Sequence, residues 1–224
     1  MIFARSYLKL PPELGGMEAH VYRLTEEQRL QGTKVYLFYR YGNGFHDDDI
    51  QVRPVFFDST FPFVFQIFDF YLGFLWTLYR QKIRFDVLHM HGDWSSFLFA
   101  PIFKRCFKLK FVAGSFHGAF RNDKVGKYRR FFAFLDILFC TGMREVTSFQ
   151  RILDIPVIWR PSGIEPEFFR ANSSKRDRTI ISVGTLNYVK NHKLVIDVAR
   201  ILPTYRFYIV GAGDCYTDLL NYIE

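Results

Sequence analysis

The sequence predicts an α/β fold with mostly parallel strands, and two observations carry this prediction. Short runs of β-branched and aromatic residues alternate with helix-length segments along the 224 residues, which is typical of repeated βαβ units. Hydrophobic residues make up 49% of the chain and include 27 Phe, enough for a buried core that is rich in aromatic side chains. We therefore expect a Rossmann-like N-terminal domain followed by the start of a second Rossmann-like domain.

The first domain is predicted to contain alternating strands and helices. The strands are expected at Val35–Tyr39, Ile50–Phe57, Val87–Met90, Lys110–Ser115, Ile137–Thr141 and Val157–Arg160. The helices are expected at Glu18–Gln31, Phe63–Gln81, Ser95–Arg105, Val125–Leu135 and Arg144–Leu153. Gly32 follows the first of these helices directly, as glycine often does at a helix end.

A polar segment, RANSSKRDR at Arg170–Arg178, separates this region from the C-terminal part of the chain. Its charge and its lack of apolar residues are typical of an interdomain linker. Beyond it, a strand at Thr179–Val183, a helix at Asn191–Leu202 and a strand at Arg206–Val210 begin another βαβ domain. We predict an N-terminal domain at residues 1–169, a linker at 170–178 and an incomplete C-terminal domain at 179–224, because about 50 residues bury too little surface for a complete α/β domain.

The segment Phe61–Tyr79 has nearly the length of a membrane-spanning helix. Gln66, Asp69 and Gly73 interrupt its apolar character, and an Asp near the middle of a lone span costs about 2.5–3.5 kcal/mol on insertion scales. The pattern favours a buried or partly buried helix. A helix that docks on a membrane surface and a spanning helix are the alternatives.

Charge and cysteine usage limit the partners and the compartment. The formal net charge is +8, which favours anionic partners. The basic runs at 104–110 and 124–130 have aromatic neighbours, which favours peripheral contact with an anionic membrane over nucleic-acid binding, with a solvated face as the alternative. The three cysteines form no CxxC pair, and the first residues show no basic stretch followed by an apolar run of the signal-peptide kind. We therefore predict a cytoplasmic protein, located at the inner face of the cell membrane if the basic runs bind lipid.

A glycine pair, Gly15-Gly16, stands directly before the first predicted helix, with Glu18 in its first turn. Paired glycines let the backbone approach a ligand closely, and the free N–H groups of the helix attract an anion, so the motif suits a phosphate or a sugar. A simple tight turn is the alternative. The motif is not GxGxxG, and no acidic residue follows the next strand as a dinucleotide site requires, which argues against a Rossmann oxidoreductase.

Histidines follow two neighbouring strands at their carboxyl ends, where open α/β sheets bind ligands. His89 and His91 end one strand, and His117 and Gly118 follow the next. His117 is the stronger candidate, because imidazole hydrogen-bonds hydroxyl groups in either protonation state and the adjacent glycine leaves room for a sugar. A structural histidine is the alternative at each position.

We predict no metal ion. His89 and His91 alternate along one strand, but no further ligand is spaced in the sequence to join them. The acidic triplet Asp47–Asp49 follows a glycine-containing turn and is expected to be a solvated loop.

The second domain has its own candidates. Gly184 and Thr185 follow its first strand, and Lys190 stands beside the start of its first helix. A lysine next to a helix N-terminus is well placed to bind a diphosphate. A solvated surface lysine is the alternative.

The order of these motifs resembles that of family 4 retaining glycosyltransferases of the GT-B fold. The similar segments are Gly15–Val21, Asp86–His91, Phe116–Gly118, Pro161–Ile164 and Val183–Lys190. The resemblance implies that Gly16 lies near the phosphates of the donor, that His117 lies near the transferred sugar, and that Lys190 holds the diphosphate leaving group. Thr185 stands where the family usually has a phosphate-binding arginine, and Asn191 where a glycine is usual. The family's glutamate-rich donor motif would fall beyond Glu224.

The implied activity is that of a hexosyltransferase. It transfers a sugar from a nucleotide diphosphate sugar to a glycan or lipid-linked acceptor in surface polysaccharide or lipopolysaccharide synthesis. The anomeric configuration would be retained, and neither a metal nor another cofactor would be needed. Because the donor half is incomplete, we expect residues 1–224 alone to be nearly inactive. The alternative is a truncated, non-catalytic remnant that binds a membrane or a partner enzyme.

Overall fold

The computed structural model describes residues 1–12, 15–117, 129–163 and 178–223. The chain divides into two compact units, Met1–Gly163 and Ile164–Glu224, and each is described by itself. The predicted linker at 170–178 falls almost entirely outside the described residues, so the predicted domain boundaries stay predictions.

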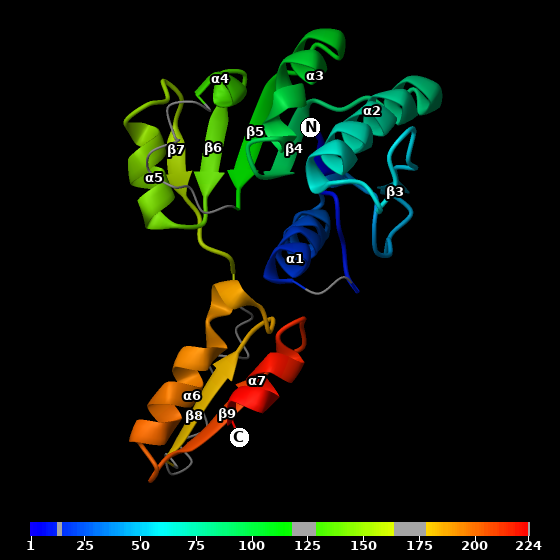
Figure 1. The fold of residues 1–224 in the computed structure, drawn as a ribbon. Coiled ribbons are helices and arrows are strands. Elements are labelled where there is room, and N and C mark those ends of the chain that lie inside the picture. Colours follow the sequence, from blue (N-terminus) through cyan, green and yellow to red (C-terminus); the bar gives the residue numbers. More distant parts are fainter. Residues whose placement is uncertain (13–14, 118–128, 164–177, 224) are drawn as a thin grey trace. The chain divides into compact units, whose positions relative to one another are not determined.

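The first unit contains a seven-stranded sheet in the order β3-β2-β1-β4-β5-β6-β7 (Figure 1). All neighbouring strands are parallel. The strands are β1 (Ile2–Ser6), β2 (Lys34–Tyr39), β3 (Asp49–Gln51), β4 (Val87–Gly92), β5 (Phe111–Phe116), β6 (Ile137–Cys140) and β7 (Val157–Trp159). The predicted fold class, α/β with a mostly parallel sheet, is confirmed.

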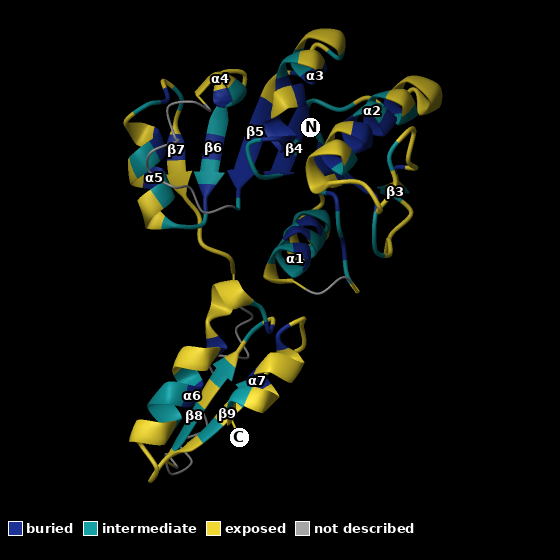
Figure 2. Ribbon diagram, in the orientation of Figure 1, coloured by how far each residue is buried: buried dark blue, intermediate teal, exposed yellow. Residues whose placement is uncertain are grey.

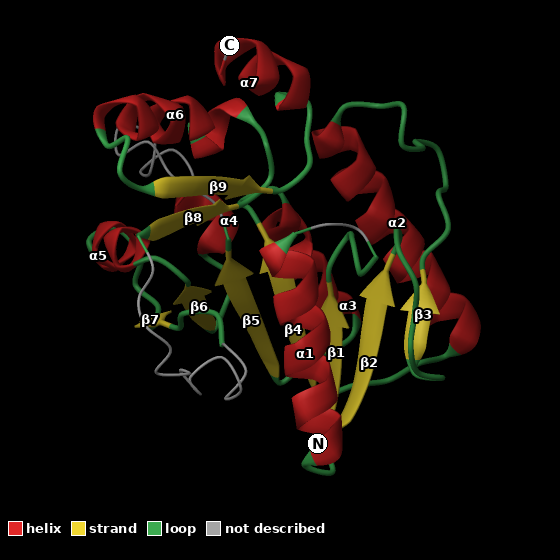
Figure 3. Ribbon diagram, turned by 90° about the horizontal axis from the view of Figure 1, so that it is seen from below, coloured by secondary structure: helices red, strands yellow, loops and turns green. Residues whose placement is uncertain are grey.

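Helices connect these strands. They are α1 (Gly16–Leu30), α2 (Phe63–Gln81), the 3₁₀ helix η1 (Ser96–Phe99), α3 (Ala100–Cys106), α4 (Arg129–Phe132) and α5 (Met143–Gln150). Helix α1 crosses one face of the sheet (Figure 3), where Val21 packs against Leu37 and Tyr39. Because successive strand residues point to opposite faces, Phe38 belongs to the core on the other face.

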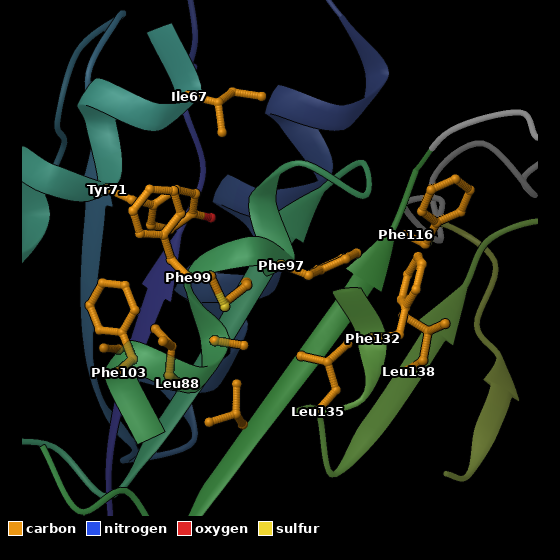
Figure 4. Packing of buried hydrophobic residues seen from close by; sticks show 14 of the residues in the cluster. Ile67, Tyr71, Leu88, Phe97, Phe99, Phe103, Phe116, Phe132, Leu135 and Leu138 are labelled. Carbon is orange, nitrogen blue, oxygen red and sulfur yellow. The ribbon is translucent and has the colours of Figure 1, made fainter. Parts of the chain in front are cut away.

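That other face carries the main core. Aromatic side chains from the helices pack there against strand residues such as Leu88 and Leu138 (Figure 4). The rings of Tyr71 and Phe99 stack with centroids 5.0 Å apart, and a buried side chain of this size contributes about 1.5–3 kcal/mol. Most residues of strands β4 and β5, in the middle of the sheet, are buried (Figure 2).

The second unit is smaller. Strands β8 (Thr179–Val183) and β9 (Arg206–Val210) pair in parallel, and the 3₁₀ helix η4 (Tyr188–Lys190), α6 (His192–Ile201) and α7 (Tyr216–Ile223) complete it. Its core consists of Leu186, Ile196, Cys215 and Leu219. Helix α7 was not predicted from the sequence.

One strand was missed from the sequence and another was predicted too long. Strand β1 was not predicted, although it pairs with both β2 and β4. The strand expected at Ile50–Phe57 ends at Gln51. Pro54 lacks a backbone N–H, and the N–H groups of residues 55–57 bind the Asp69 carboxylate instead of a neighbouring strand.

Three further expectations differ from the structure. The helix expected at Ser95–Arg105 is divided into η1 and α3, because Pro101 stands in the first turn of α3. The helix expected at Val125–Leu135 is helical over Arg129–Phe132, and residues 118–128 lie outside the described residues. The Asp47–Asp49 triplet is not wholly a solvated loop, since the Asp49 carboxylate is buried and binds Arg29 at 2.7 Å.

Helix α2 contains most of the apolar segment that resembled a membrane span. Its Asp69 is buried and accepts a 2.7 Å hydrogen bond from Arg40. The residue that interrupts the apolar pattern therefore belongs to a buried ion pair. Within the described part of the chain, no helix is both long and apolar enough to cross a membrane.

Candidate functional site

The strand order of the first unit creates a crevice at the carboxyl edge of its sheet. From β1 the order runs to β2 and β3 on one side, and from β4 to β7 on the other. At such a switch point the two connections leave the sheet in opposite directions, and the gap between them is where open α/β sheets bind ligands. The segment that follows β1 leads to Gly15 and Gly16, and β4 ends at His91 and Gly92.

Three histidines converge at this edge. His20 lies on the second turn of α1, His91 is the penultimate residue of β4, and His117 directly follows β5. The backbone N–H of His117 donates to the carbonyl oxygen of Gly92 at 3.0 Å, so the ends of β4 and β5 are joined beside the cluster. His91 Nδ1 and His117 Nε2 lie 3.2 Å apart in a hydrogen bond.

The ring of His20 completes the group. Its centroid lies 5.6 Å from that of His117 and 6.2 Å from that of His91. His89, two residues before His91 on the same face of β4, binds Ser115 Oγ through Nε2 at 2.8 Å. Its ring is thereby held in place beside the cluster.

Burial keeps these imidazoles neutral. It lowers the pKa of His117 to about 4, with the nearby His20 adding to the effect. Burial is also the main cause that lowers the pKa values of His89 and His91 well below the ordinary value of 6.5. The charges of neighbouring side chains lower these pKa values further. The pKa of His20 is lowered by burial and then by Arg5. At pH 7 these rings therefore act as neutral donors and acceptors, not as cations.

Arg5 provides a buried positive charge behind the histidines. Its Nη1 donates to Thr25 Oγ1 at 2.7 Å and its Nη2 to Gln28 Oε1 at 2.6 Å. Both acceptors are neutral, and among the described residues its Nε has no hydrogen-bond partner. Burial, followed by the charge of Arg29, lowers the pKa of Arg5 to about 9. A buried guanidinium with neutral partners favours an anion in the adjacent cavity.

Two cavities meet at His117. The larger, about 770 Å³, lies along the α1 side of the sheet, and its lining includes Arg5, His20, His89 and Ser115. The smaller, about 230 Å³, is lined by Tyr7, Met17, His91 and Asp93 among others. The larger volume is within the range of small-molecule sites. His117 is the residue that both cavities share.

The glycine motif stands at the start of α1. Gly15 precedes the first residue of α1 in an extended conformation, and a Cβ at Gly16 would meet no atom within 4 Å. The backbone at Gly16 is therefore open to close approach. The carboxylate of Glu18 is buried and accepts a 3.3 Å hydrogen bond from the hydroxyl of Tyr7, an internal contact. Gly118 lies outside the described residues.

The candidates of the second unit lie at the end of β8. Gly184 donates its N–H to the carbonyl oxygen of Val210 at 3.0 Å, and Thr185 and Lys190 are exposed. Lys190 ends η4, two residues before α6, and its backbone N–H is bound by the side chain of Asn187 at 3.1 Å. Lys190 is thus an exposed residue close to the start of α6.

Residues 14–167, which include the glycine motif and all three histidines, match Glycosyltransferase Family 4. The chain belongs to this family. The resemblance inferred from the order of motifs is therefore confirmed, although the roles of single residues stay predictions. No curated protein matches the chain in sequence.

Solved glycosyltransferases share the fold at low sequence identity. WaaG, a glycosyltransferase involved in lipopolysaccharide biosynthesis, is 13% identical with a TM-score of 0.68, covering 99% of this chain and 66% of WaaG. The catalytic domain of starch synthase IV from Arabidopsis thaliana is 11% identical with a TM-score of 0.65, covering 95% of this chain and 68% of that one. An α,α-trehalose-phosphate synthase from Burkholderia vietnamiensis is 14% identical with a TM-score of 0.56, covering 99% and 65%. The family 4 chain therefore has the GT-B fold and spans slightly less than two thirds of WaaG.

Two site residues of this family 4 chain were missed from the sequence. Arg5 was missed because β1 itself was not predicted, although the short apolar run Ile2-Phe3-Ala4 is a weak strand signal. His20 was missed because its proximity to His91 and His117 arises from tertiary packing of α1. The only local signal is that His20 follows Gly16 by four residues, which places both on one side of the helix.

Gly92, the last residue of β4 beside the cluster, has a backbone conformation that a substitution can test. Its φ of +147° favours glycine, and a Cβ there would lie 2.2 Å from Ser96 Oγ. We expect Gly92→Ala to lower the free energy of unfolding by about 1–3 kcal/mol through backbone strain. Urea denaturation measures this, with Gly163→Ala as the control, since a Cβ at Gly163 would meet no atom within 4 Å. Equal stability of the two variants would contradict the expectation.

Proposed function

We propose that the protein transfers a sugar from a nucleotide diphosphate sugar to a glycan or lipid-linked acceptor, in surface polysaccharide or lipopolysaccharide synthesis. Retention of the anomeric configuration and independence of metal ions and cofactors are parts of this proposal. The proposal rests on membership of Glycosyltransferase Family 4. The alternative is a non-catalytic remnant with the same fold. A screen of donors distinguishes this alternative from the proposed transferase.

The observation that carries the proposal is the meeting of α1, which begins at Gly16, with His91 and His117 at the switch point of the sheet. The open backbone at the start of α1 suits the phosphates of the donor, since free helix N–H groups attract anions. The neutral His117, shared by two cavities, suits the sugar, because it can exchange hydrogen bonds with hydroxyl groups. In the second unit, Lys190 suits the diphosphate leaving group.

A donor screen tests the proposal. The full-length gene product that contains residues 1–224 is incubated with labelled UDP-, GDP- and ADP-sugars and with glycan and lipid-linked acceptors, in the presence of EDTA. The proposal predicts sugar transfer from at least one donor, undiminished by EDTA, with the product anomer matching that of the donor by NMR. Release of no nucleotide diphosphate from any donor would favour the non-catalytic remnant, and an inverted product would contradict retention.

We further propose that α2 brings the protein to an anionic membrane. Trp76 and Tyr79 are 60% and 76% exposed, and the exposed Arg80 and Lys82 follow them. Aromatic rings beside cations are typical of surfaces that bind the interface of an anionic bilayer. The basic runs support this less than the sequence suggested, because several of their charges are paired within the chain: Lys104 with Asp136, Lys110 with Asp86 and Arg129 with Asp154.

Vesicle binding checks the α2 surface. We expect the double variant Trp76→Ser and Tyr79→Ser to bind vesicles that contain phosphatidylglycerol at least about tenfold more weakly than the wild type, since two exposed rings would no longer enter the interface. Co-sedimentation measures the binding. Tyr188→Ser, an exposed tyrosine of the second unit, is the control and should bind as the wild type does. Unchanged sedimentation of the double variant would remove α2 from the membrane proposal.

A further inference from the structure

The three histidines at the switch point have the composition of a metal site. They come from three separate elements, and one potential ligand nitrogen from each lies within 4.8 Å of the others. Imidazole is a preferred ligand of zinc and of neighbouring transition metals. No third ligand was expected from the sequence, because the spacing of His89 and His91 does not reveal the rings that the fold brings to this edge.

The distances agree with tetrahedral coordination. Zinc binds imidazole nitrogen at about 2.0–2.1 Å, so two nitrogens bound to one ion in tetrahedral geometry lie about 3.3–3.4 Å apart. His91 Nδ1 and His117 Nε2 are 3.2 Å apart. An ion between them would replace their hydrogen bond with little movement of either ring.

His20 can complete the site by a small rotation. Its ring is half-buried, and its ring contacts are with His91 and His117. Among the described residues, no hydrogen bond holds its imidazole in the present position. A change of side-chain rotamer in a partly exposed residue costs little. The nitrogen of His20, now within 4.8 Å of the other two ligand nitrogens, can therefore move closer to them.

The state of the rings also suits a metal. Metal ions bind the neutral imidazole, and a neutral ring already has one nitrogen free of hydrogen, so binding requires a change of tautomer without loss of a proton. In His91 the metal would bind Nδ1, so the proton would stand on the buried Nε2, which has no hydrogen-bond partner among the described residues.

We propose that His20, His91 and His117 bind one zinc-type transition metal ion at the switch point, with a fourth position open to the cavities. The cluster contributes no carboxylate that would neutralise the ion. The bound ion would keep its charge, so the fourth position would take hydroxide, phosphate or another small anion. Because the ion would occupy His117 Nε2, it would inhibit any reaction in which that atom binds substrate.

Metal binding is measured on the full chain without substrate, which separates this proposal from the proposed transfer activity. Isothermal titration with ZnCl₂ in a non-chelating buffer should give binding of one ion per chain. Both His20→Gln and His117→Gln should weaken it at least about tenfold, since even outer-sphere partners of metal ligands are worth that much. His46→Gln alters an exposed histidine outside the cluster and should bind zinc as the wild type does.

Cobalt spectroscopy on the unaltered protein provides a second readout that does not depend on the folding of a variant. Co²⁺ should give the strong visible bands of tetrahedral coordination without thiolate charge-transfer bands, because the ligands are nitrogen and not the free cysteines. The proposal is overturned if zinc does not bind, if it binds all four proteins equally, or if the cobalt spectrum shows thiolate ligands.

Discussion

Replacing His117 with Ala should lower kcat/KM for sugar transfer by about 10²- to 10³-fold, the usual effect of removing one preorganised polar group from a reaction centre. His117 is shared by the two cavities and is held by the backbone bond to Gly92 and by the ring of His91. A neutral imidazole in this position can hydrogen-bond a hydroxyl of the transferred sugar as charge develops. Initial rates with the donor found in the screen measure the effect.

The pH profile distinguishes this role from that of a titrating acid or base. Burial lowers the pKa of His117 to about 4 from 6.5, so the ring is neutral throughout pH 5.5–8. We therefore expect no limb in the rate profile near pH 6.5 that disappears in His117→Ala.

His46→Ala is the matched control for the rate measurement, because His46 is exposed in the loop before β3. It should leave kcat/KM within about twofold of the wild type, as exposed substitutions away from a site usually do. If His117→Ala retained the wild-type rate, His117 would have no part in the reaction.

Replacing Asp69 with Ala should destabilise the protein by about 3–5 kcal/mol, because it leaves the buried Arg40 without its counter-ion. The Asp69 carboxylate accepts hydrogen bonds from Arg40 Nη2 at 2.7 Å and from the backbone N–H groups of Val55, Phe56 and Phe57 at 2.9, 2.6 and 3.2 Å. One side chain thus joins α2, the residue that follows β2 and the segment after β3. Urea denaturation followed by circular dichroism measures the loss.

The control for this substitution is another ion pair of the same unit. The carboxylate of Asp154 is 85% exposed and pairs with Arg129, and Asp154→Ala should cost at most about 1 kcal/mol. Equal losses in the two variants would show that the buried pair is no more important than an exposed one.

Acid should remove the same contribution. Burial alone would raise the pKa of Asp69, but the three backbone N–H groups and Arg40 outweigh it and lower that pKa below its ordinary value of 3.8. The contribution is therefore complete above about pH 4 and is lost as the pH falls through the lower, folded-state pKa. The stability difference between the wild type and Asp69→Ala should narrow in that range.

The sequence predicted the fold where local and tertiary preferences agree. The alternation of strands and helices predicted the parallel sheet, and the apolar strand Val87–Met90 lies within β4. Prediction failed where a side chain distant in the sequence determined the backbone conformation. This is the case at residues 55–57, whose N–H groups bind Asp69 instead of extending β3. It also failed at β1, because its apolar run is only three residues long and is followed by Arg5 and Ser6.

The candidate site was predictable to the extent that strand ends are. His91 and His117 follow apolar strands, and parallel pairing brings their ends together through the register of His91 with Ser115. The presence of His20 and Arg5 depends on how α1 packs across the sheet, which no spacing in the sequence encodes. The geometry of the proposed metal site could not be predicted for the same reason, because its third histidine, His20, belongs to α1.

The most direct test of the central claim, that the switch point of the first unit is the donor-sugar site of a glycosyltransferase, is a titration that needs no acceptor. Histidine ring signals of the ¹⁵N-labelled protein are followed by NMR during a titration. The titrant is the nucleotide diphosphate sugar that the donor screen identifies as the donor. We expect shifts for His91 and His117 that saturate with the donor, while His46 is unchanged. Saturable donor binding that leaves both His91 and His117 unshifted would contradict the claim.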